Sequence, residues 1–205
     1  MKSVGIIDYD VGNLDSIGRA IEECGGRPVL ARQGNELAGV AAIILPGVGA
    51  FSHGMRNLRE RGFEDALHDH VVDHQIPVLG VCLGMQLLAT SGAEGGAERG
   101  LGWIQGEVVR LEPTDSAERV PHIGWNEVYP DGPSPLFRSI DPGGDFYFVH
   151  SYHLACLDDT EVAARTPAFG GFASAVSKEH VMGVQFHPEK SQRVGFQLIK
   201  NFLAI

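Results

Sequence analysis

Residues 78–86 read Val78-Leu79-Gly80-Val81-Cys82-Leu83-Gly84-Met85-Gln86, and this segment is the most informative in the chain. An apolar run that ends in Gly-x-Cys-x-Gly is typical of a buried strand turning sharply into a helix, with glycines that permit the strained turn. Such a turn lifts the Cys82 side chain out of the sheet toward solvent and places its thiol at a helix N-terminus, where the dipole favours the thiolate. The alternative is a small apolar cysteine on a buried strand. The paired glycines favour a nucleophile.

The first half of the chain alternates short apolar runs with segments of helical spacing. Strands are expected at residues 4–7, 28–31, 41–45 and 76–81. Asn13 is expected to cap a helix that Gly25-Gly26 stops, and residues 55–72 have mixed helical spacing and many charges. Continuous apolar strands that alternate with helices predict a parallel sheet covered on both faces.

In the second half, strand-like segments follow one another with turns between them. The expected strands are 106–111, 125–129, 145–154, 161–165, 173–176 and 181–186, before a helix at 192–203. Two Gly-rich segments, 92–102 and 141–144, are predicted to be surface loops. We therefore expect an α/β fold with an open, mostly parallel central sheet, helices on both faces and an antiparallel or mixed β elaboration in the second half. The length fits a single domain over residues 1–205.

Composition argues against several classes of protein. A net charge of −10 leaves no basic stripe, so neither nucleic acid nor a membrane is an expected partner. Three cysteines fit a reducing compartment rather than a disulfide framework, and neither a signal peptide nor a membrane span is visible, so we expect a cytoplasmic protein. His68, His70 and His74 cluster without an acid or cysteine set to complete a zinc site, so no metal and no cofactor are expected.

A thiol nucleophile needs a base, and His187 is the best placed of the nine histidines. It follows the apolar run 181–186 and precedes Pro188, which turns the chain. Residues two apart in an extended segment point the same way, so Glu189 can hold one ring nitrogen and leave the other for Cys82. Both side chains follow strands, and sites of open α/β sheets form at the carboxyl ends of strands. The alternative is a structural histidine in a turn, beside a solvated Glu189.

An acyl-transfer site also needs donors for a developing oxyanion. The backbone N–H of Leu83, directly after the nucleophile, is one candidate. The loop that contains Gly47, Val48 and Gly49 is another, because glycines there permit a conformation that aims an N–H into the site. An ordinary tight turn is the alternative for this loop.

The pattern Gly80-x-Cys82-x-Gly84-x-Gln86, followed much later by His187-Pro188-Glu189, resembles the class I (triad) glutamine amidotransferases. Within this class the chain is similar to the glutaminase subunits of imidazole glycerol phosphate synthases, which act in histidine biosynthesis. The further runs that carry this narrower resemblance are Pro46-Gly47-Val48-Gly49-Ala50-Phe51, Pro121-His122-Ile123-Gly124-Trp125-Asn126-Glu127, Tyr147-Phe148-Val149-His150-Ser151-Tyr152 and Gln185-Phe186-His187-Pro188-Glu189-Lys190-Ser191.

The resemblance implies hydrolysis of glutamine to glutamate and ammonia through a thioester on Cys82. His187 would protonate the ammonia and then activate water, and Glu189 would orient the imidazole. Gln86, one helical turn beyond Cys82, faces the same way and is a candidate substrate ligand. By resemblance, the glutamine amino-acid end would be held by Glu94 and the backbone of Ser151 and Tyr152, although Glu94 also fits a solvated loop acid.

The resemblance also implies a partner. Ammonia would pass to a (βα)8-barrel cyclase subunit that makes imidazole glycerol phosphate and aminoimidazole-carboxamide ribonucleotide, and the two subunits would form a heterodimer. The chain has no phosphate-binding Gly-rich loop with a lysine, so it is not expected to bind the nucleotide alone. The candidate interface residues are His122, Trp125, Asn126, Tyr147 and Lys190, with a place in the core as the alternative for Trp125 and Tyr147. Partner binding is expected to switch the glycine loop into its active state.

Three other interpretations stay open at this point. A thiol peptidase or stress protein can raise a cysteine on a similar elbow, but it does not call for His-Pro-Glu after a late strand or for Gln86. An amidotransferase with another ammonia acceptor would keep the triad and change the partner. A non-catalytic assembly subunit would not need Cys82, His187 and Glu189 together. A comparison of free glutamine with a peptide as substrate would distinguish the peptidase interpretation from the others.

Overall fold

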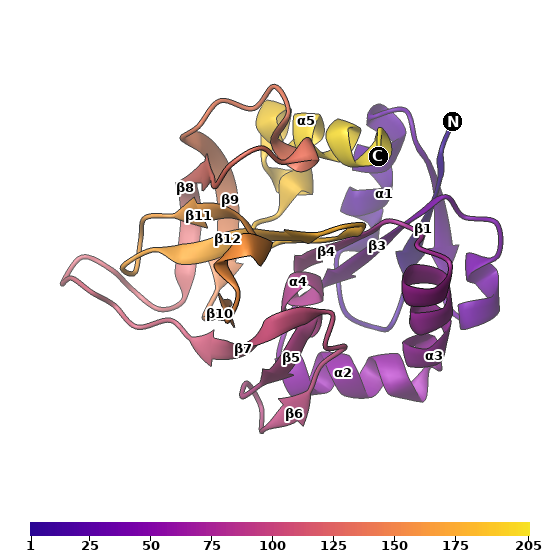
Figure 1. Ribbon diagram of the computed structural model, residues 1–205, viewed down its shortest axis with the longest axis horizontal. Coiled ribbons are helices and arrows are strands. Elements are labelled where there is room, and N and C mark those ends of the chain that lie inside the picture. The colour runs from indigo at the N-terminus through magenta and orange to yellow at the C-terminus, as the bar shows by residue number, and fades with distance from the viewer.

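The computed structural model describes residues 1–205 and is built around a nine-stranded sheet (Figure 1). The strand order is β2-β1-β3-β4-β13-β12-β11-β8-β9. The bounds are β1 (Ser3–Ile7), β2 (Arg27–Ala31), β3 (Ala42–Gly47), β4 (Val78–Cys82), β8 (His122–Pro130), β9 (Gly144–His150), β11 (Val162–Thr166), β12 (Phe172–Lys178) and β13 (Val181–Val184). Pairing is parallel from β2 through β13 and antiparallel from β13 to β9, so the elaboration continues the same sheet.

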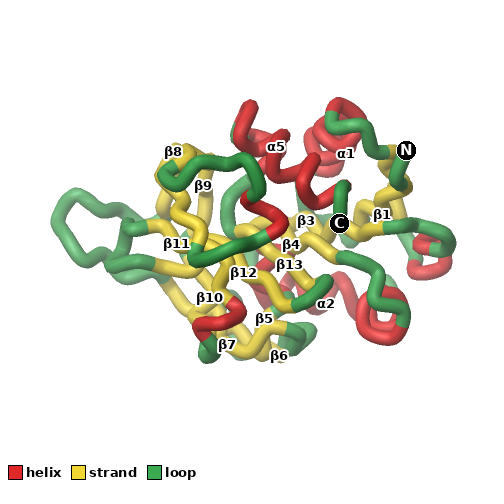
Figure 2. Tube along the Cα trace, turned by 45° about the horizontal axis from the view of Figure 1, so that its top comes forward, coloured by secondary structure: helices red, strands yellow, loops and turns green.

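A second sheet of four strands lies beside the antiparallel half, in the order β10-β7-β5-β6. Its strands are β5 (Ala89–Gly92), β6 (Glu98–Arg99), β7 (Ile104–Arg110) and β10 (Tyr152–Cys156). The connection from β7 to β8 forms a long loop that extends away from the body of the molecule (Figure 2).

Helices cover both faces of the parallel half (Figure 1). Helices α1 (Leu14–Glu23) and α5 (Gln192–Leu203) pack on one face, and α2 (Phe51–Glu60), α3 (Phe63–Leu67) and α4 (Leu83–Leu87) on the other. Successive residues of β1 serve different cores, since Ile6 packs with α1 and α5 whereas Ile7 packs with α2 and α3. This alternation is what a strand buried on both faces requires. The expected fold class is confirmed.

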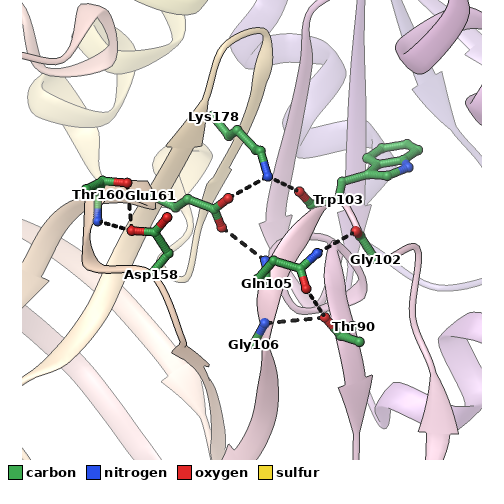
Figure 3. Close-up of polar contacts among 9 residues, drawn as sticks. All are labelled: Thr90, Gly102, Trp103, Gln105, Gly106, Asp158, Thr160, Glu161 and Lys178. Atoms are coloured by element: carbon green, nitrogen blue, oxygen red, sulfur yellow. Dashed lines mark hydrogen bonds and ion pairs between the residues drawn. The ribbon is translucent and has the colours of Figure 1, made fainter.

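A buried carboxylate ties the two sheets together (Figure 3). Glu161, in the short turn Asp159–Glu161, accepts the backbone N–H of Gln105 in β7 at 3.0 Å and pairs with Lys178 of β12 at 2.6 Å. A buried charge is costly unless it is paired and hydrogen-bonded, and Glu161 has both kinds of partner. This cluster is structural, because it joins β7 to β12.

The mixed helical spacing of residues 55–72 corresponds to several short segments, because Gly62 adopts a left-handed φ of 69° between α2 and α3, and residues 68–73 form a π-helical turn. Two expectations about local structure are wrong. The segment 145–154 is two strands, since β9 and β10 belong to different sheets. The segment 92–102 is not all loop, because β6 pairs there with the end of β5. No helix of the chain combines the length and apolar character that crossing a membrane requires.

Candidate active site

The carboxyl ends of three adjacent parallel strands carry the predicted site. The register of β3 and β4 places Gly47 directly beside Cys82, and that of β4 and β13 pairs Val81 with Val184. Strand β3 runs two residues further than expected because its pairing persists to Cys82, and β13 ends two residues earlier than expected. The nucleophile, the glycine loop and the segment after β13 therefore meet at one edge of the sheet.

Cys82 occupies the elbow between β4 and α4, with φ 53° and ψ −109°. It does not face solvent as expected, because the surrounding core leaves it only 5% exposed. This conformation is unfavourable for a residue with a Cβ, by about 1–3 kcal/mol. The strained residue is Cys82 itself. The flanking glycines therefore do not relieve strain in the turn, as was expected, but allow close packing. A Cβ on Gly84 would lie 1.7 Å from the carbonyl oxygen of Leu45, and one on Gly80 would lie 2.6 Å from the carbonyl carbon of Gly84. The glycines let α4 pack directly against β3 and β4.

His187 and Glu189 form a buried pair next to this elbow. Nδ1 of His187 lies 2.8 Å from Oε1 of Glu189, and the imidazole is 3% exposed. Nε2 of His187 and Oε2 of Glu189 are buried without a hydrogen-bond partner. His187 is extended, as predicted, but Glu189 lies in the 3-10 turn Pro188–Lys190 rather than in a continued strand. The hydroxyl of Ser191 donates to the carbonyl of His187 at 2.6 Å and so fixes this turn.

The charge state of His187 follows from its neighbours. Burial lowers its pKa, but hydrogen bonding and electrostatic interaction with Cys82 and Glu189 outweigh burial and raise the pKa to about 9. The imidazole therefore carries a proton at neutral pH. A protonated imidazole beside a sulfur nucleophile can give its proton to a leaving group and afterwards act as a base.

A pocket of about 330 Å³ opens beside Cys82. It brings together seven residues predicted as oxyanion or substrate groups: Val48, Gly49, Leu83, Gln86, Glu94, Ser151 and Tyr152. Pro121, Val149 and His150 also line it and were not predicted to do so. His187 does not line the pocket, and its link to the pocket is Cys82.

Backbone donors border the pocket beside the thiol. Leu83 is the first residue of α4, so its N–H has no acceptor within the helix. The N–H groups of Val48 and Gly49 donate no hydrogen bond within the chain, and Gly49 has a φ of 103° that favours glycine. Tyr9 Oη donates to the carbonyl of Pro46 at 2.6 Å and anchors the base of this loop. Three free N–H groups near a nucleophile are what an oxyanion site requires.

Glu94 presents a half-buried carboxyl group to the pocket. Burial raises its pKa, and the backbone N–H of Phe51, the first residue of α2, opposes that shift. The backbone carbonyl of Glu94 accepts the N–H of Ser52 at 3.1 Å. Its loop is thereby held against the start of α2 rather than standing free in solvent.

Two side-chain amides lead from the pocket wall to the nucleophile. Nε2 of Gln86 donates to the carbonyl of Tyr152 at 2.8 Å and to Oε1 of Gln185 at 3.1 Å. Nε2 of Gln185 donates to Sγ of Cys82 at 3.7 Å. Both amide protons of Gln86 are thus engaged inside the protein, which leaves its oxygen for a substrate. Gln185 was not among the predicted site residues, although it lies two residues before His187, a spacing that puts both on one side of an extended segment.

A chain of neutral groups leads from the same Tyr152 carbonyl, through His150 of the pocket lining, to Asn126. Nδ2 of Asn126 lies 3.2 Å from Nε2 of His122, whose Nδ1 is 3.0 Å from Nε2 of His150, and Nδ1 of His150 is 2.9 Å from the carbonyl oxygen of Tyr152. Burial lowers the pKa of His150 to about 3, against the opposing effect of the Tyr152 carbonyl, and burial also lowers that of His122. Both imidazoles are uncharged near neutral pH.

The candidate interface residues divide between the two faces of β8. His122 is buried and Asn126 half-buried, whereas Trp125 is 47% exposed beside Ile123, which is 60% exposed. The Trp125 ring lies 5.9 Å from the ring of Tyr147, and Nζ of Lys190 lies 5.6 Å from the Tyr147 ring centroid. This aromatic face borders the turn that contains His187 and Glu189, since the carbonyl of Tyr147 accepts the N–H of His187 at 2.9 Å.

The histidine cluster of the 68–74 segment is engaged with its own backbone. Nδ1 of His70 lies 2.9 Å from the carbonyl oxygen of Ala66, and Nδ1 of His74 lies 2.8 Å from that of Asp69. No group of three or more histidine, cysteine, aspartate or glutamate side chains is placed to hold a metal ion.

Known proteins resemble this chain over nearly its whole length. Residues 6–205 match the family model of glutamine amidotransferase class-I. The chain is 43% identical to imidazole glycerol phosphate synthase subunit HisH 1 of Campylobacter jejuni, over 98% of the chain and 100% of that protein, and 42% identical to subunit HisH of Leptospira interrogans, with the same coverage.

Solved structures agree on the fold. A crystal structure of a glutamine amidotransferase superposes with a TM-score of 0.76 at 22% identity, covering 98% of this chain and 99% of that one. PurLQS from Thermotoga maritima gives a TM-score of 0.76 at 18% identity, covering 99% of this chain and 98% of the other.

Proposed function

The chain belongs to the class-I glutamine amidotransferase family, and on that premise we propose that it is the glutamine-hydrolysing subunit of an imidazole glycerol phosphate synthase in histidine biosynthesis. The observation that carries the proposal is the Cys82–His187–Glu189 arrangement. A nucleophile on a strained elbow lies beside an imidazole that a buried carboxylate orients at 2.8 Å. The glutaminase activity is assigned to one domain over residues 1–205.

In the proposed first step, the thiolate of Cys82 attacks the side-chain carboxamide carbon of glutamine in the pocket. Negative charge develops on the carboxamide oxygen, which the N–H groups of Leu83 and of Val48 or Gly49 stabilise. Protonated His187 gives its Nε2 proton to the departing nitrogen. Ammonia leaves, and a thioester joins the glutamyl group to Sγ.

In the second step, neutral His187 takes a proton from water as the water attacks the thioester carbon. Glutamate leaves and Cys82 is released as the thiolate, beside an imidazole that is again protonated. Glu189 holds the ring through Nδ1 in both steps and stabilises its charged form. The balance is one glutamine and one water consumed for one glutamate and one ammonia formed.

Substrate recognition in this proposal uses the remaining lining groups. The oxygen of Gln86, the carboxylate of Glu94 and the backbone of Ser151 and Tyr152 hold the amino-acid end of glutamine. The support is their common position around one 330 Å³ pocket beside Cys82. A pocket at the lower end of the range for small-molecule sites suits a free amino acid better than a peptide chain.

The proposed partner is a (βα)8-barrel cyclase subunit that receives the ammonia and forms a heterodimer with this chain. The exposed aromatic face around Trp125, Tyr147 and Lys190 is the proposed interface, because aromatic side chains at an exposed surface are common anchors of protein–protein contacts. His122 and Asn126 lie on the other side of β8 and support this surface from within the protein. Three free cysteines fit work in the reducing cytoplasm.

The loop at Gly47 to Gly49 is the proposed switch. Without the partner and its nucleotide, the loop turns its N–H away from the oxyanion position, and partner binding favours the productive orientation. The anchored base at Pro46 and the unpaired N–H groups beyond it support a change confined to this short segment.

The test is glutaminase activity of the chain alone and of the chain mixed with a barrel cyclase subunit and its nucleotide. We expect strong stimulation in the mixture and loss of activity in Cys82→Ala. Full activity of the lone chain would support the glutaminase function and contradict the proposed switch. Activity that another acceptor enzyme stimulates instead would reassign the partner, and cleavage of peptides without glutamine hydrolysis would overturn the function.

A further inference from the structure

The carbonyl oxygen of Tyr152 fixes the orientation of both glutamine side chains near the nucleophile. A backbone carbonyl can only accept, so the Gln86 atom that lies 2.8 Å from it is the amide nitrogen. The second proton of that nitrogen points at Gln185, 3.1 Å away, so the facing atom of Gln185 is its oxygen. The orientation of each amide follows from a fixed acceptor.

The nitrogen of Gln185 is then left to face Sγ of Cys82, at 3.7 Å. Gln185 is fully buried, and its backbone N–H pairs with the carbonyl of Ser174 at 2.9 Å, so its side chain starts from a rigid position. Gln86 is almost as deeply buried. The amide nitrogen of Gln185 is therefore held against Sγ of Cys82 by hydrogen bonds that lead through Gln86 to the backbone carbonyl of Tyr152.

We propose that Gln185 is a fourth member of the catalytic group, whose side-chain amide donates to the Cys82 thiolate, and that Gln86 is the residue that positions it. An amide N–H is not acidic, so it can stabilise a sulfur anion without ever protonating it. The imidazolium of His187, in contrast, gives up its proton during turnover. The Gln185 amide thus stabilises the thiolate before it attacks and again when it leaves the thioester in the second step. Only this role in turnover rests on the proposed function.

The test is the rate at which iodoacetamide alkylates Cys82 as a function of pH, in the full-length chain without glutamine or partner. Only the thiolate reacts, so the rate reports how much thiolate is present. Gln185→Met removes the donor at similar volume, and we expect the alkylation rate at pH 6–7 to fall about tenfold, or about 1.4 kcal/mol. Gln185→Glu keeps the shape and adds a carboxylate, so its rate should fall further.

Controls are available within the same chain. Peptide mass spectrometry follows Cys24 and Cys156 in the same samples, and their alkylation should not change. Gln105→Met alters an exposed glutamine of β7 outside the site and should leave the alkylation rate of Cys82 unchanged. Circular dichroism checks the fold, and if Gln185→Met does not fold, the isosteric Gln185→Glu decides.

Gln86→Met separates positioning from substrate binding. If Gln86 orients Gln185, alkylation of Cys82 should slow about threefold in the absence of glutamine. A change in the KM for glutamine with unchanged alkylation would make Gln86 a substrate ligand only and overturn its positioning role. Unchanged alkylation in a folded Gln185→Met or Gln185→Glu would overturn the proposal, whatever the protein's substrate is.

Discussion

Two buried histidines of this chain, His187 and His150, differ in charge although they are alike in burial. They are 3% and 6% exposed, and each makes a hydrogen bond through Nδ1. Yet the pKa of His187 is raised to about 9 and that of His150 is lowered to about 3. Burial lowers the pKa of both rings, but only His187 has Cys82 and the Glu189 carboxyl group beside it to raise the pKa. His150 faces a neutral carbonyl and another imidazole.

The hydrogen-bond partners of each ring explain why the two histidines differ. Around His187, buried atoms without partners leave Nε2 free for a reaction. Around His150, every ring nitrogen is satisfied, and the Tyr152 carbonyl fixes a neutral tautomer through to Asn126. The first arrangement is chemically reactive and the second is rigid, so we expect opposite consequences when each is disturbed.

The largest difference is expected in catalysis. His187→Asn removes the proton donor and base, and kcat of the complex for glutamine should fall by about 10³-fold or more, with a small change in KM. His150→Asn should leave kcat within about tenfold, because His150 acts on the pocket wall and not on the reacting bonds. Steady-state kinetics on both variants measures this, and equal losses would erase the distinction.

Removing the carboxylate should make His187 more like His150. Glu189→Gln keeps the shape but not the charge, so the pKa of His187 should fall and kcat near neutral pH should drop by about 10²-fold. The pH–rate profile of kcat is the measurement. A profile unchanged in both height and position would show that Glu189 does not set the state of the imidazole.

The sequence predicted contacts correctly where they depend on local spacing. The elbow around Cys82 and the proximity of His187 to Glu189 each involve residues a few positions apart, and the structure brings them together. The pairing of His122 with His150 was missed because it depends on the register of β8 against β9, which no local pattern specifies. Strand ends were misjudged where pairing with a neighbour extended or stopped them, as at β3.

Stability should respond to pH in opposite directions for the two histidines. His150 has a depressed pKa, so its contribution is present above about pH 6.5 and is lost as pH falls toward 3. Between pH 6.5 and 5, we expect a loss of about 2 kcal/mol in the free energy of unfolding, reduced in His150→Phe. Urea unfolding across this range measures it, and equal slopes for the two proteins would contradict the assignment.

His187 should act on the alkaline side. Its raised pKa means that its contribution is present below about pH 6.5 and disappears as pH rises through about 9. His187→Asn should therefore flatten the decline in the free energy of unfolding between pH 7 and 9. An unchanged decline would show that His187 is not the group responsible.

The smallest effect is expected at the nucleophile that faces His187. Because Cys82 has a φ of 53°, Cys82→Gly should be more stable than Cys82→Ala by about 1–2 kcal/mol, although both are inactive. Thermal unfolding of the two variants isolates the backbone effect, since neither retains the sulfur. A more stable alanine variant would mean that the elbow relaxes when the thiol is removed.

The opposite charge states of His187 and His150 are tested most directly by a pH titration of the histidine ring nitrogens by ¹⁵N NMR, on the chain without substrate or partner. We expect the His187 ring to carry two protons through neutral pH with a midpoint near 9, and His150 to stay neutral down to acid pH. Both Cys82→Ala and Glu189→Gln should lower the His187 midpoint. A His187 midpoint at or below the ordinary value of about 6.5 would contradict the account, because the protonated imidazole it assigns to catalysis would then be absent at neutral pH.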